Sequence, residues 1–192
     1  MGLSVTVAVA TYGELRWQTL AQHRAVPSAE RLGVPVLHHH SSGGLHDARN
    51  EVLDKVDTAH VIYLDADDEL EPGYIAAMTG ASGDVRVPRV RYVRSHARAP
   101  ALMPRVPGHR HACAAECLIY GNWIVIGACV RTDLLRAVGG WLDFPWAEDW
   151  SAWLRCYQAG ADIQPAPGAV YRAHVRMDSR NRGQAQGVRL EA

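Results

Sequence analysis

The chain has 192 residues, of which 48% are hydrophobic, and this length suits one substantial core and leaves little for a second domain. Its 20 acidic and 20 basic residues balance, which argues against bulk attraction to nucleic acid or anionic lipid. No run reaches the roughly 18 apolar residues of a membrane span, and the start lacks the basic-then-apolar pattern of a secretory signal. We therefore expect a soluble cytoplasmic protein with one domain at 1–177 and a polar, disordered tail at 178–192, and we expect its four cysteines to stay reduced.

The first part of the chain alternates between short apolar runs and segments with helical periodicity. Residues 5–10 predict a strand and residues 15–25 a helix. A second strand is expected at 33–37 and a second helix at 46–56. Residues 61–64 are all apolar, as in a central parallel strand that helices cover on both faces. Three successive strand-helix units predict an α/β fold with a doubly wound, mostly parallel sheet.

The second part is less regular. Its predicted elements are a short helix to residue 78, a strand at 84–93, a strand at 123–130, helices at 132–138 and 150–157, and closing strands at 163–166 and 170–174. Residues 95–111 are rich in Arg, Pro and Ala without periodicity, and we interpret them as a substrate-side loop. The wider segment 86–111 carries seven arginines and no acid, which fits either an anionic partner or a solvated face.

Three carboxylates directly follow the apolar strand at 61–64. Asp65, Asp67 and Asp68 lie where open α/β sheets bind their ligands, just outside the carboxyl ends of the strands. Clustered carboxylates repel one another unless a cation lies among them, and oxygen ligands suit Mg²⁺ or Mn²⁺. The alternative is an acidic turn in which Asp68 or Glu69 caps the next helix.

Glu148 and Asp149 begin the helix expected around Trp150. A helix N-terminus favours negative charge, so this pair predicts either a carboxylate kept ionised to accept a proton or simple capping. Arg49 and His174 are further candidates, for a phosphate and for a metal or diphosphate, respectively. A zinc site is a weaker hypothesis, because its ligands have no standard spacing: His109, His111, Cys113 and Cys117.

The order of these pieces resembles a family 2 glycosyltransferase of the GT-A fold. The resemblance runs from about Val5 to His174, and its motifs are Thr11-Tyr12, Ala48-Arg49-Asn50, the run 63–72, Val138-Gly139-Gly140-Trp141, Glu148-Asp149-Trp150 with Trp153 and Arg155, and Tyr171-Arg172 with His174. It implies a Rossmann-like three-layer αβα sandwich. It also implies an inverting transfer of a sugar from a nucleotide-diphosphate sugar to an acceptor hydroxyl, with Mn²⁺ or Mg²⁺ as cofactor.

The resemblance also assigns roles to residues. Thr11, Tyr12 and Glu14 would line the nucleoside pocket, with Arg49 near the base or diphosphate. Asp65 and Asp67 would contact the donor, and the metal ligands would be Asp67, Asp68 and His174, with Asp68 favoured. Asp149 would be the general base, with Glu148 beside it. The acceptor stays unidentified, and a homo-oligomer is compatible with the sequence.

Two departures from the family pattern concern the donor and the acceptor. His38-His39-His40 and a short Ser-Gly loop stand where family members usually carry an acidic residue that reads the base. The chain also stops soon after His174, which leaves acceptor binding to residues 95–123 or to a partner.

Two other functions compete with this interpretation. A phosphatase of the haloacid dehalogenase type needs a lysine after its aspartates, whereas the one lysine, Lys55, precedes them. A non-catalytic module of the same fold that binds nucleotide sugars or carbohydrates is the main alternative.

Overall fold

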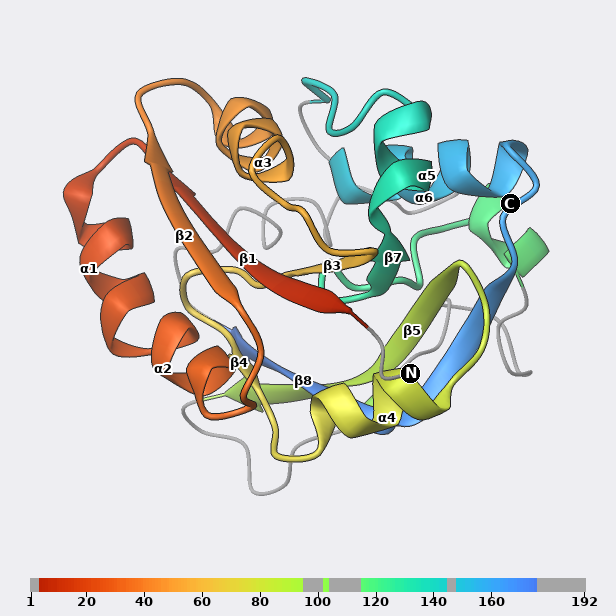
Figure 1. Cartoon of the computed structure of the whole chain (residues 1–192), viewed down its shortest axis with the longest axis horizontal. Coiled ribbons are helices and arrows are strands. Elements are labelled where there is room, and N and C mark those ends of the chain that lie inside the picture. Colours follow the sequence, from red (N-terminus) through yellow and green to blue (C-terminus); the bar gives the residue numbers. More distant parts are fainter. Residues whose placement is uncertain (1–3, 95–101, 104–114, 145–147, 176–192) are drawn as a thin grey trace, which may run out of the picture.

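One sheet organises the part of the chain that the computed structural model describes, residues 4–94, 102–103, 115–144 and 148–175 (Figure 1). Its strands are β1 (Val5–Tyr12), β2 (Val36–Ser41), β3 (His60–Tyr63), β4 (Glu69–Leu70), β5 (Val85–Arg94), β6 (Leu102–Met103), β7 (Cys129–Arg131) and β8 (Ile163–Val175). The helices are α1 (Leu15–His23), α2 (Ala25–Glu30), α3 (Leu45–Leu53), α4 (Tyr74–Gly80), α5 (Thr132–Ala137) and α6 (Glu148–Gln158), with a 3₁₀ turn, η1, at Ala115–Ile119.

The strand order is β2-β1-β3-β7-β5-β8-β4, with β6 paired to β5. Parallel pairing of β1 with β2 and β3, and of β5 with β8, leaves β1, β2, β3, β5 and β8 pointing one way. The strands β7, β4 and β6 run antiparallel to their neighbours. The predicted α/β fold with a mostly parallel sheet is therefore confirmed.

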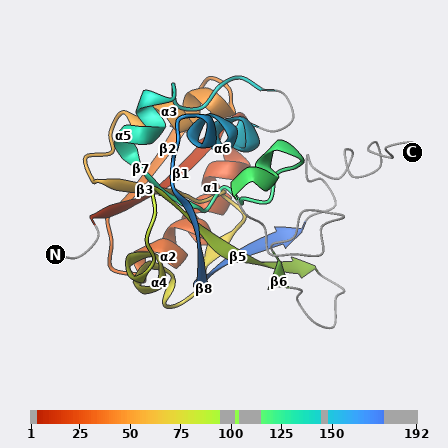
Figure 2. The ribbon, with the colours of Figure 1, turned by 90° about the vertical axis from the view of Figure 1, so that its right-hand side faces the viewer.

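Helices cover both faces of this sheet. The chain moves from β1 to β2 in one direction and from β2 to β3 in the other, and right-handed crossovers then place α1 and α2 on one face and α3 on the other. Figure 2 shows the result, with α3, α5 and α6 grouped above the strands and α2 and α4 below them. The expected three layers are present.

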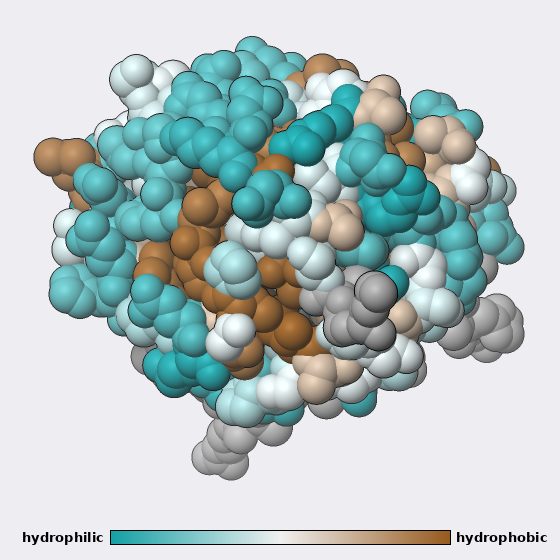
Figure 3. Space-filling model, viewed as in Figure 1, coloured by the Kyte–Doolittle hydropathy of each residue, from teal (hydrophilic) through white to brown (hydrophobic). Residues whose placement is uncertain are grey.

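The core lies along the central strands. Every residue of β3 is buried, and β1 is buried from Val5 to Thr11, as the unbroken apolar runs in the sequence require. The edge strand β2 is only half-buried, which lets it hold three histidines. Figure 3 shows a hydrophobic area in the middle of one face, where Figure 1 shows the strands between the surrounding helices.

Several element boundaries differ from the predicted ones. The helix expected at 15–25 breaks at Arg24, whose φ of −128° and ψ of −70° are not helical, and the chain continues as α2. The strand expected at 33–37 begins later and extends to Ser41. Most of the strand expected at 123–130 is irregular, and only Cys129–Arg131 pairs with neighbours. The two closing strands are one, β8. Its register against β5 shifts between Pro88 and Arg89, where β8 residues 167–169 are left without a partner on β5.

Some predictions lie outside the described residues. These include the tail at 178–192, most of the loop at 95–111, and His109, His111 and Cys113 of the zinc hypothesis. The described cysteines Cys117, Cys129 and Cys156 are free thiols. No helix in the described ranges is both long and apolar enough to cross a bilayer. The cytoplasmic location and the homo-oligomer stay predictions.

Candidate active site

The two acidic motifs meet at one buried arginine. Arg49, on α3, has 3% of its side chain exposed and donates to Asp65 Oδ1 and to Glu148 Oε1, each at 3.0 Å. Burial works against its charge, but the carboxylates of Asp65 and Glu148 outweigh burial and raise the pKa of Arg49. Residues 16 and 99 positions away in the sequence therefore join one ionic cluster.

The Arg49 guanidinium packs on an aromatic cluster. The Arg49 guanidinium carbon lies 4.9 Å from the centre of the Trp141 ring, a cation-π contact. Trp141 packs edge-on against Tyr63 and Trp153, with ring centres 4.8 and 5.8 Å away. The Tyr63 hydroxyl donates to the Arg49 carbonyl at 2.9 Å, so backbone and side chain of Arg49 are both fixed.

The Trp141 backbone is held by Asn50. The Asn50 amide donates to the Trp141 carbonyl at 2.8 Å and accepts from the Trp141 N–H at 2.9 Å. Gly140, with φ of +63°, precedes this contact, and a Cβ there would lie 2.5 Å from Asn50 Oδ1. Arg155 donates to the carbonyls of Val138 and Gly140. Several motif residues of the sequence thus form the frame around the cluster.

Asp149 is partly buried at the start of α6. Its Oδ1 accepts from the Trp150 N–H at 2.8 Å, and its Oδ2 accepts from the Asn122 amide at 3.0 Å. Burial raises the pKa of Asp149 to about 6, and the Glu148 charge adds to this, while Arg49 opposes it. A carboxylate with this pKa is ionised at neutral pH and is a better proton acceptor than an ordinary aspartate.

Asp68 turns away from this cluster into the core. Its Oδ2 accepts from the Tyr171 hydroxyl at 2.8 Å and its Oδ1 from the His174 N–H at 2.7 Å. Tyr171 in turn accepts from the Asp65 N–H at 3.3 Å. Burial, followed by the charges of Asp65 and Asp67, raises the pKa of Asp68 well above its ordinary value. Asp68 therefore ties the acidic turn to β8.

This tie needs a glycine at position 127. A Cβ on Gly127 would lie 2.2 Å from Cδ2 of the Tyr171 ring, so no other residue fits while Tyr171 keeps its place. The Gly127 carbonyl also accepts from the Tyr74 hydroxyl at 2.7 Å.

The His174 side chain joins a charged row across β4, β8 and β5. His174 Nε2 lies 2.8 Å from Glu69 Oε2, and Arg172 and Arg91 contact Glu71 at 3.4 and 2.7 Å. Burial favours the neutral acid at Glu69, yet the hydrogen bond from His174 and nearby positive charge hold the pKa of Glu69 below its usual value. The structure places the His174 ring on Glu69, while the metal role predicted for it stays a prediction.

The predicted nucleoside residues lie at the end of β1. Thr11 is 2% exposed, and its hydroxyl donates to the His39 carbonyl at 3.2 Å and lies 3.0 Å from His40 Nδ1. Tyr12 is half-buried, and Glu14 is exposed and pairs with Arg16 at 3.1 Å. Thr11 thus fixes β2 against β1 at the carboxyl edge of the sheet.

The described residues contain no group of three His, Cys, Asp or Glu side chains arranged to hold a metal ion. Asp65 keeps 44% of its side chain exposed beside Arg49, whereas Asp67 is half-buried and its carbonyl accepts from Arg24 at 2.9 Å. The acidic turn therefore offers carboxylates, without a complete protein cage.

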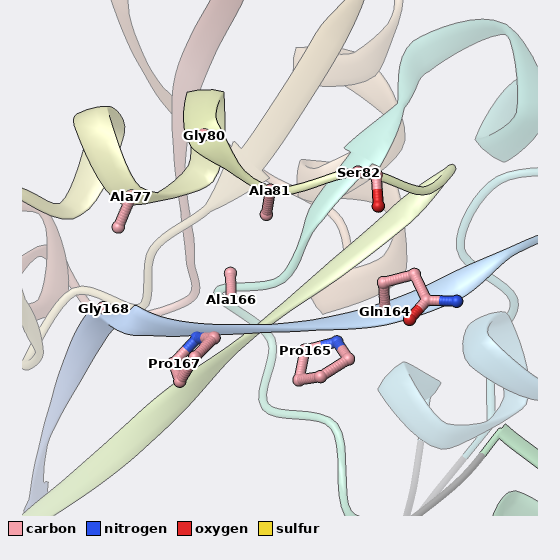
Figure 4. Close-up of a pocket in the computed structure, with 9 residues that line it drawn as sticks. All are labelled: Ala77, Gly80, Ala81, Ser82, Gln164, Pro165, Ala166, Pro167 and Gly168. Carbon is pink, nitrogen blue, oxygen red and sulfur yellow. The ribbon is translucent and has the colours of Figure 1, made fainter.

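An open groove of about 450 Å³ lies elsewhere, between α4 and the first half of β8. Figure 4 shows Ala166 pointing toward α4, while Pro165 and Pro167 point away from it. No ionisable side chain lines the groove. It offers no acid, base or metal ligand, so the candidate active site is the Arg49 cluster.

Comparison with known proteins gives a family-model match for part of the chain. Residues 7–84 match the model of glycosyl transferase family 2. Over this segment, which is less than half of the chain, the sequence is similar to that family. The matched segment contains Arg49 and the acidic turn but ends before Glu148. The match therefore covers only part of the cluster. No curated protein matches the chain.

Solved structures share the fold. S. aureus TarS 1-349 in complex with UDP-GlcNAc superposes with a TM-score of 0.59 at 16% identity, over 92% of this chain and 60% of that one. TarS 1-349 in complex with UDP gives 0.58 at 17% identity, over 90% and 61%. GalNAc-T7 with UDP, GalNAc and Mn²⁺ gives 0.58 at 15% identity, over 92% and 45%. The chain thus has the GT-A type of fold and spans less than two thirds of the length of these structures.

The sequence predicts Arg49, Asp65, Glu148 and Asp149 as candidates, but it assigns no role to three other residues of this site. It paired Arg49 with a donor, whereas the structure pairs it with Asp65 and Glu148. Asn122, Tyr171 and the role of Asn50 were not singled out. Tyr171 and Asn50 stood in motifs that the resemblance quoted, so the signal existed, whereas Asn122 lies in no motif.

Proposed function

We propose that this chain is a glycosyltransferase domain that moves a sugar from a nucleotide-diphosphate sugar to an acceptor hydroxyl with inversion. The supporting observation is the Arg49 bridge, which brings the acidic turn after β3 and the start of α6 to one place, 3.0 Å from the same guanidinium. The similarity of residues 7–84 to the family model, together with the fold, supports the class of reaction. Such a transfer requires one group that stabilises the leaving diphosphate and another that accepts the acceptor's proton. The acidic turn after β3 would serve the diphosphate, and the start of α6 would supply the proton acceptor.

The donor would bind at the carboxyl edge of β1 and β3. In a mostly parallel sheet this edge is the usual ligand site, and Tyr12, Glu14, Asp65 and Asp67 lie there. The TarS and GalNAc-T7 structures contain UDP, which supports a nucleoside diphosphate as the donor's leaving part. Thr11 would act through the position of β2, because its buried hydroxyl already contacts His39 and His40.

A divalent cation fits this donor site in its chemistry. Mg²⁺ is commonly held by one or two carboxylates together with substrate phosphates and water, so a complete protein cage is not required. Asp67 would be the protein ligand, with the exposed carboxylate of Asp65 beside it. The predicted ligands Asp68 and His174 would first have to exchange their contacts with Tyr171 and Glu69. When bound, the cation would neutralise charge on the departing diphosphate.

Asp149 would act as the general base. It would take the proton of the acceptor hydroxyl as the acceptor oxygen bonds to the anomeric carbon, and the bond from that carbon to the diphosphate oxygen would break, leaving its electron pair on the nucleoside diphosphate. One displacement inverts the configuration. The pKa of about 6 suits this duty at neutral pH. Arg49 would keep Glu148 paired beside the base.

A thermal-shift screen of nucleoside diphosphates with and without Mn²⁺ tests the donor half. We expect a rise in Tm with at least one nucleotide that grows when Mn²⁺ is present, because a ligand bound to the folded state stabilises by mass action. Slow hydrolysis of the matching nucleotide sugar should accompany it. Binding without hydrolysis or transfer would favour a non-catalytic module, and no response to any uridine or guanosine donor would defeat the proposal.

A further inference from the structure

One polar residue near Arg49, Asn50, hydrogen-bonds to Trp141 and not to the carboxylates of Asp65 and Glu148. Asn50 lies on α3 next to Arg49 and contacts the backbone of Trp141, 91 positions later, through both atoms of its amide. The Trp141 ring then lies 4.9 Å from the Arg49 guanidinium.

We propose that Asn50 is a positioning residue of the active site: by fixing Trp141 under Arg49, it keeps Arg49 between Asp65 and Glu148 and so maintains the electrostatic environment of Asp149. The roles of Asp149 and Glu148 in this statement rest on the proposed function. The contacts of Trp141 with Asn50 and with Arg49 do not rest on it.

The geometry favours an active-site role over general helix packing. A buried guanidinium paired with two carboxylates needs tight geometry, since a charge that loses its partner in the interior is strongly destabilising. Trp141 is 1% exposed and supplies the ring on which Arg49 rests. The missing Cβ of Gly140 leaves just enough room for the Asn50 amide. A shift of Trp141 would therefore move the guanidinium rather than be absorbed by free space.

Asp149 provides the readout. Among the described residues, the charged groups that act on it are Arg49 from α3, Asp65 after β3 and Glu148 on α6, while the Asn122 amide donates to it. Arg49 is the one positive charge in this set and favours the ionised carboxylate. If Arg49 moves away, the Asp149 carboxyl should hold its proton to higher pH.

The test compares Asn50→Ala with Arg136→Ala. Arg136, on α5, donates to the carbonyls of Leu53, the last residue of α3, and of Val56, just beyond it, both at 2.7 Å. Both variants remove two hydrogen bonds that involve α3 or the residues just after it, and we expect both to lower Tm by a similar amount. If Asn50 has a positioning role, only Asn50→Ala should change the titration of Asp149.

The measurement is the Asp149 titration, followed by ¹³C NMR of the aspartate carboxyls and assigned with Asp149→Asn, together with the pH profile of kcat/KM. In Asn50→Ala we expect the midpoint to rise by about half a pH unit or more and kcat to fall at least tenfold, while Arg136→Ala keeps the wild-type midpoint. An unmoved midpoint in folded Asn50→Ala would overturn the proposal.

The two readouts separate this proposal from the proposed function. If the NMR midpoint rises in Asn50→Ala but no variant transfers sugar, Asn50 positions the cluster and the proposed function fails. If transfer is retained with the wild-type pH profile, the function stands and the positioning role is wrong. Should Asn50→Ala not fold, Asn50→Ser, which can replace at most one of the two bonds, must show the same upward shift, and its absence there would equally refute the role.

Discussion

Two aspartates of this chain show how similar motifs serve different purposes. Asp68 and Asp149 each accept two hydrogen bonds, one of them from a backbone N–H. The Asp68 oxygens face Tyr171 and His174 within the core, whereas Asp149 is partly exposed beside a charged arginine. Asp68 has carboxylates as its nearest charges, and Asp149 has Arg49 as well.

This difference separates a carboxyl that holds the fold from one that can exchange protons. Burial and neighbouring negative charge raise the pKa of Asp68 well above its usual range, and both of its oxygens already accept hydrogen bonds that join two segments. Arg49 limits the same rise at Asp149. The partner charge, and not the motif, decides which duty each carboxyl serves.

The largest expected effect is on transfer. Asp149→Asn removes the proton acceptor but retains an oxygen for the Trp150 N–H, so kcat should fall by about a thousandfold, within the range typical of general bases. Nucleotide binding by calorimetry should stay within about threefold of wild type, because the donor half is untouched. Transfer at more than a tenth of the wild-type rate would show that Asp149 is not the base.

Asp68→Ala should mainly destabilise the fold. It leaves the Tyr171 hydroxyl and the His174 N–H without acceptors in the interior, which should lower the free energy of unfolding by about 2–4 kcal/mol in urea titrations. Asp68→Asn, which retains an oxygen acceptor, serves as the matched control and should lose less than half as much. A stable Asp68→Ala protein whose nucleotide binding no longer responds to Mn²⁺ would instead support the metal-ligand role that the sequence suggested.

The smallest effect is the pH dependence of stability. The Asp149 pKa rises from 3.8 to about 6 on folding, so between about pH 4 and pH 6 the folded protein holds a proton that the unfolded chain has released. The free energy of unfolding should therefore fall as pH rises through this window and stay level above it. After allowance for partial exposure, the Asp149 share should be about 1–2 kcal/mol.

Asp149→Asn isolates that share, because Asp68 contributes in the same direction in both proteins. The difference between the wild-type and variant stability curves should change across pH 4–6 and be flat from pH 7 to 8. Wild-type kcat/KM should rise through the same window, so activity increases where stability declines. A flat difference curve would place the Asp149 pKa near its ordinary value.

The fold was largely readable from the sequence because its signals are local. The apolar run at 61–64 and the strand-helix alternation before it need no tertiary information. The predicted strand boundaries were wrong where pairing with residues distant in the sequence decides whether a segment forms a strand. The irregular stretch before Cys129 looks as apolar as a strand, but only Cys129–Arg131 finds neighbours to pair with. The strand expected at 33–37 stops short of the β2 histidines, because polar residues fit a strand only where it lies at the sheet edge.

The sequence predicted which residues belong to the candidate site, but it did not predict which of them contact one another. Asp65, Glu148 and Arg49 were all candidates, yet spacing along the chain does not reveal that one guanidinium contacts both carboxylates. The inward turn of Asp68 was equally hidden, because its partner Tyr171 lies 103 residues away. Long-range hydrogen bonds leave no periodic pattern in a sequence.

The absent side chain at Gly127 sets a limit on variation in this protein. A methyl group there would meet the Tyr171 ring, and the Tyr171 hydroxyl contacts Asp68. A substitution at a residue without a side chain would therefore displace the acidic turn through Tyr171 and Asp68. A mutational library that preserved each carboxylate and randomised position 127 should therefore yield few working clones. A scan of all substitutions should find low tolerance at Gly127, although this residue has no direct role in the chemistry of sugar transfer.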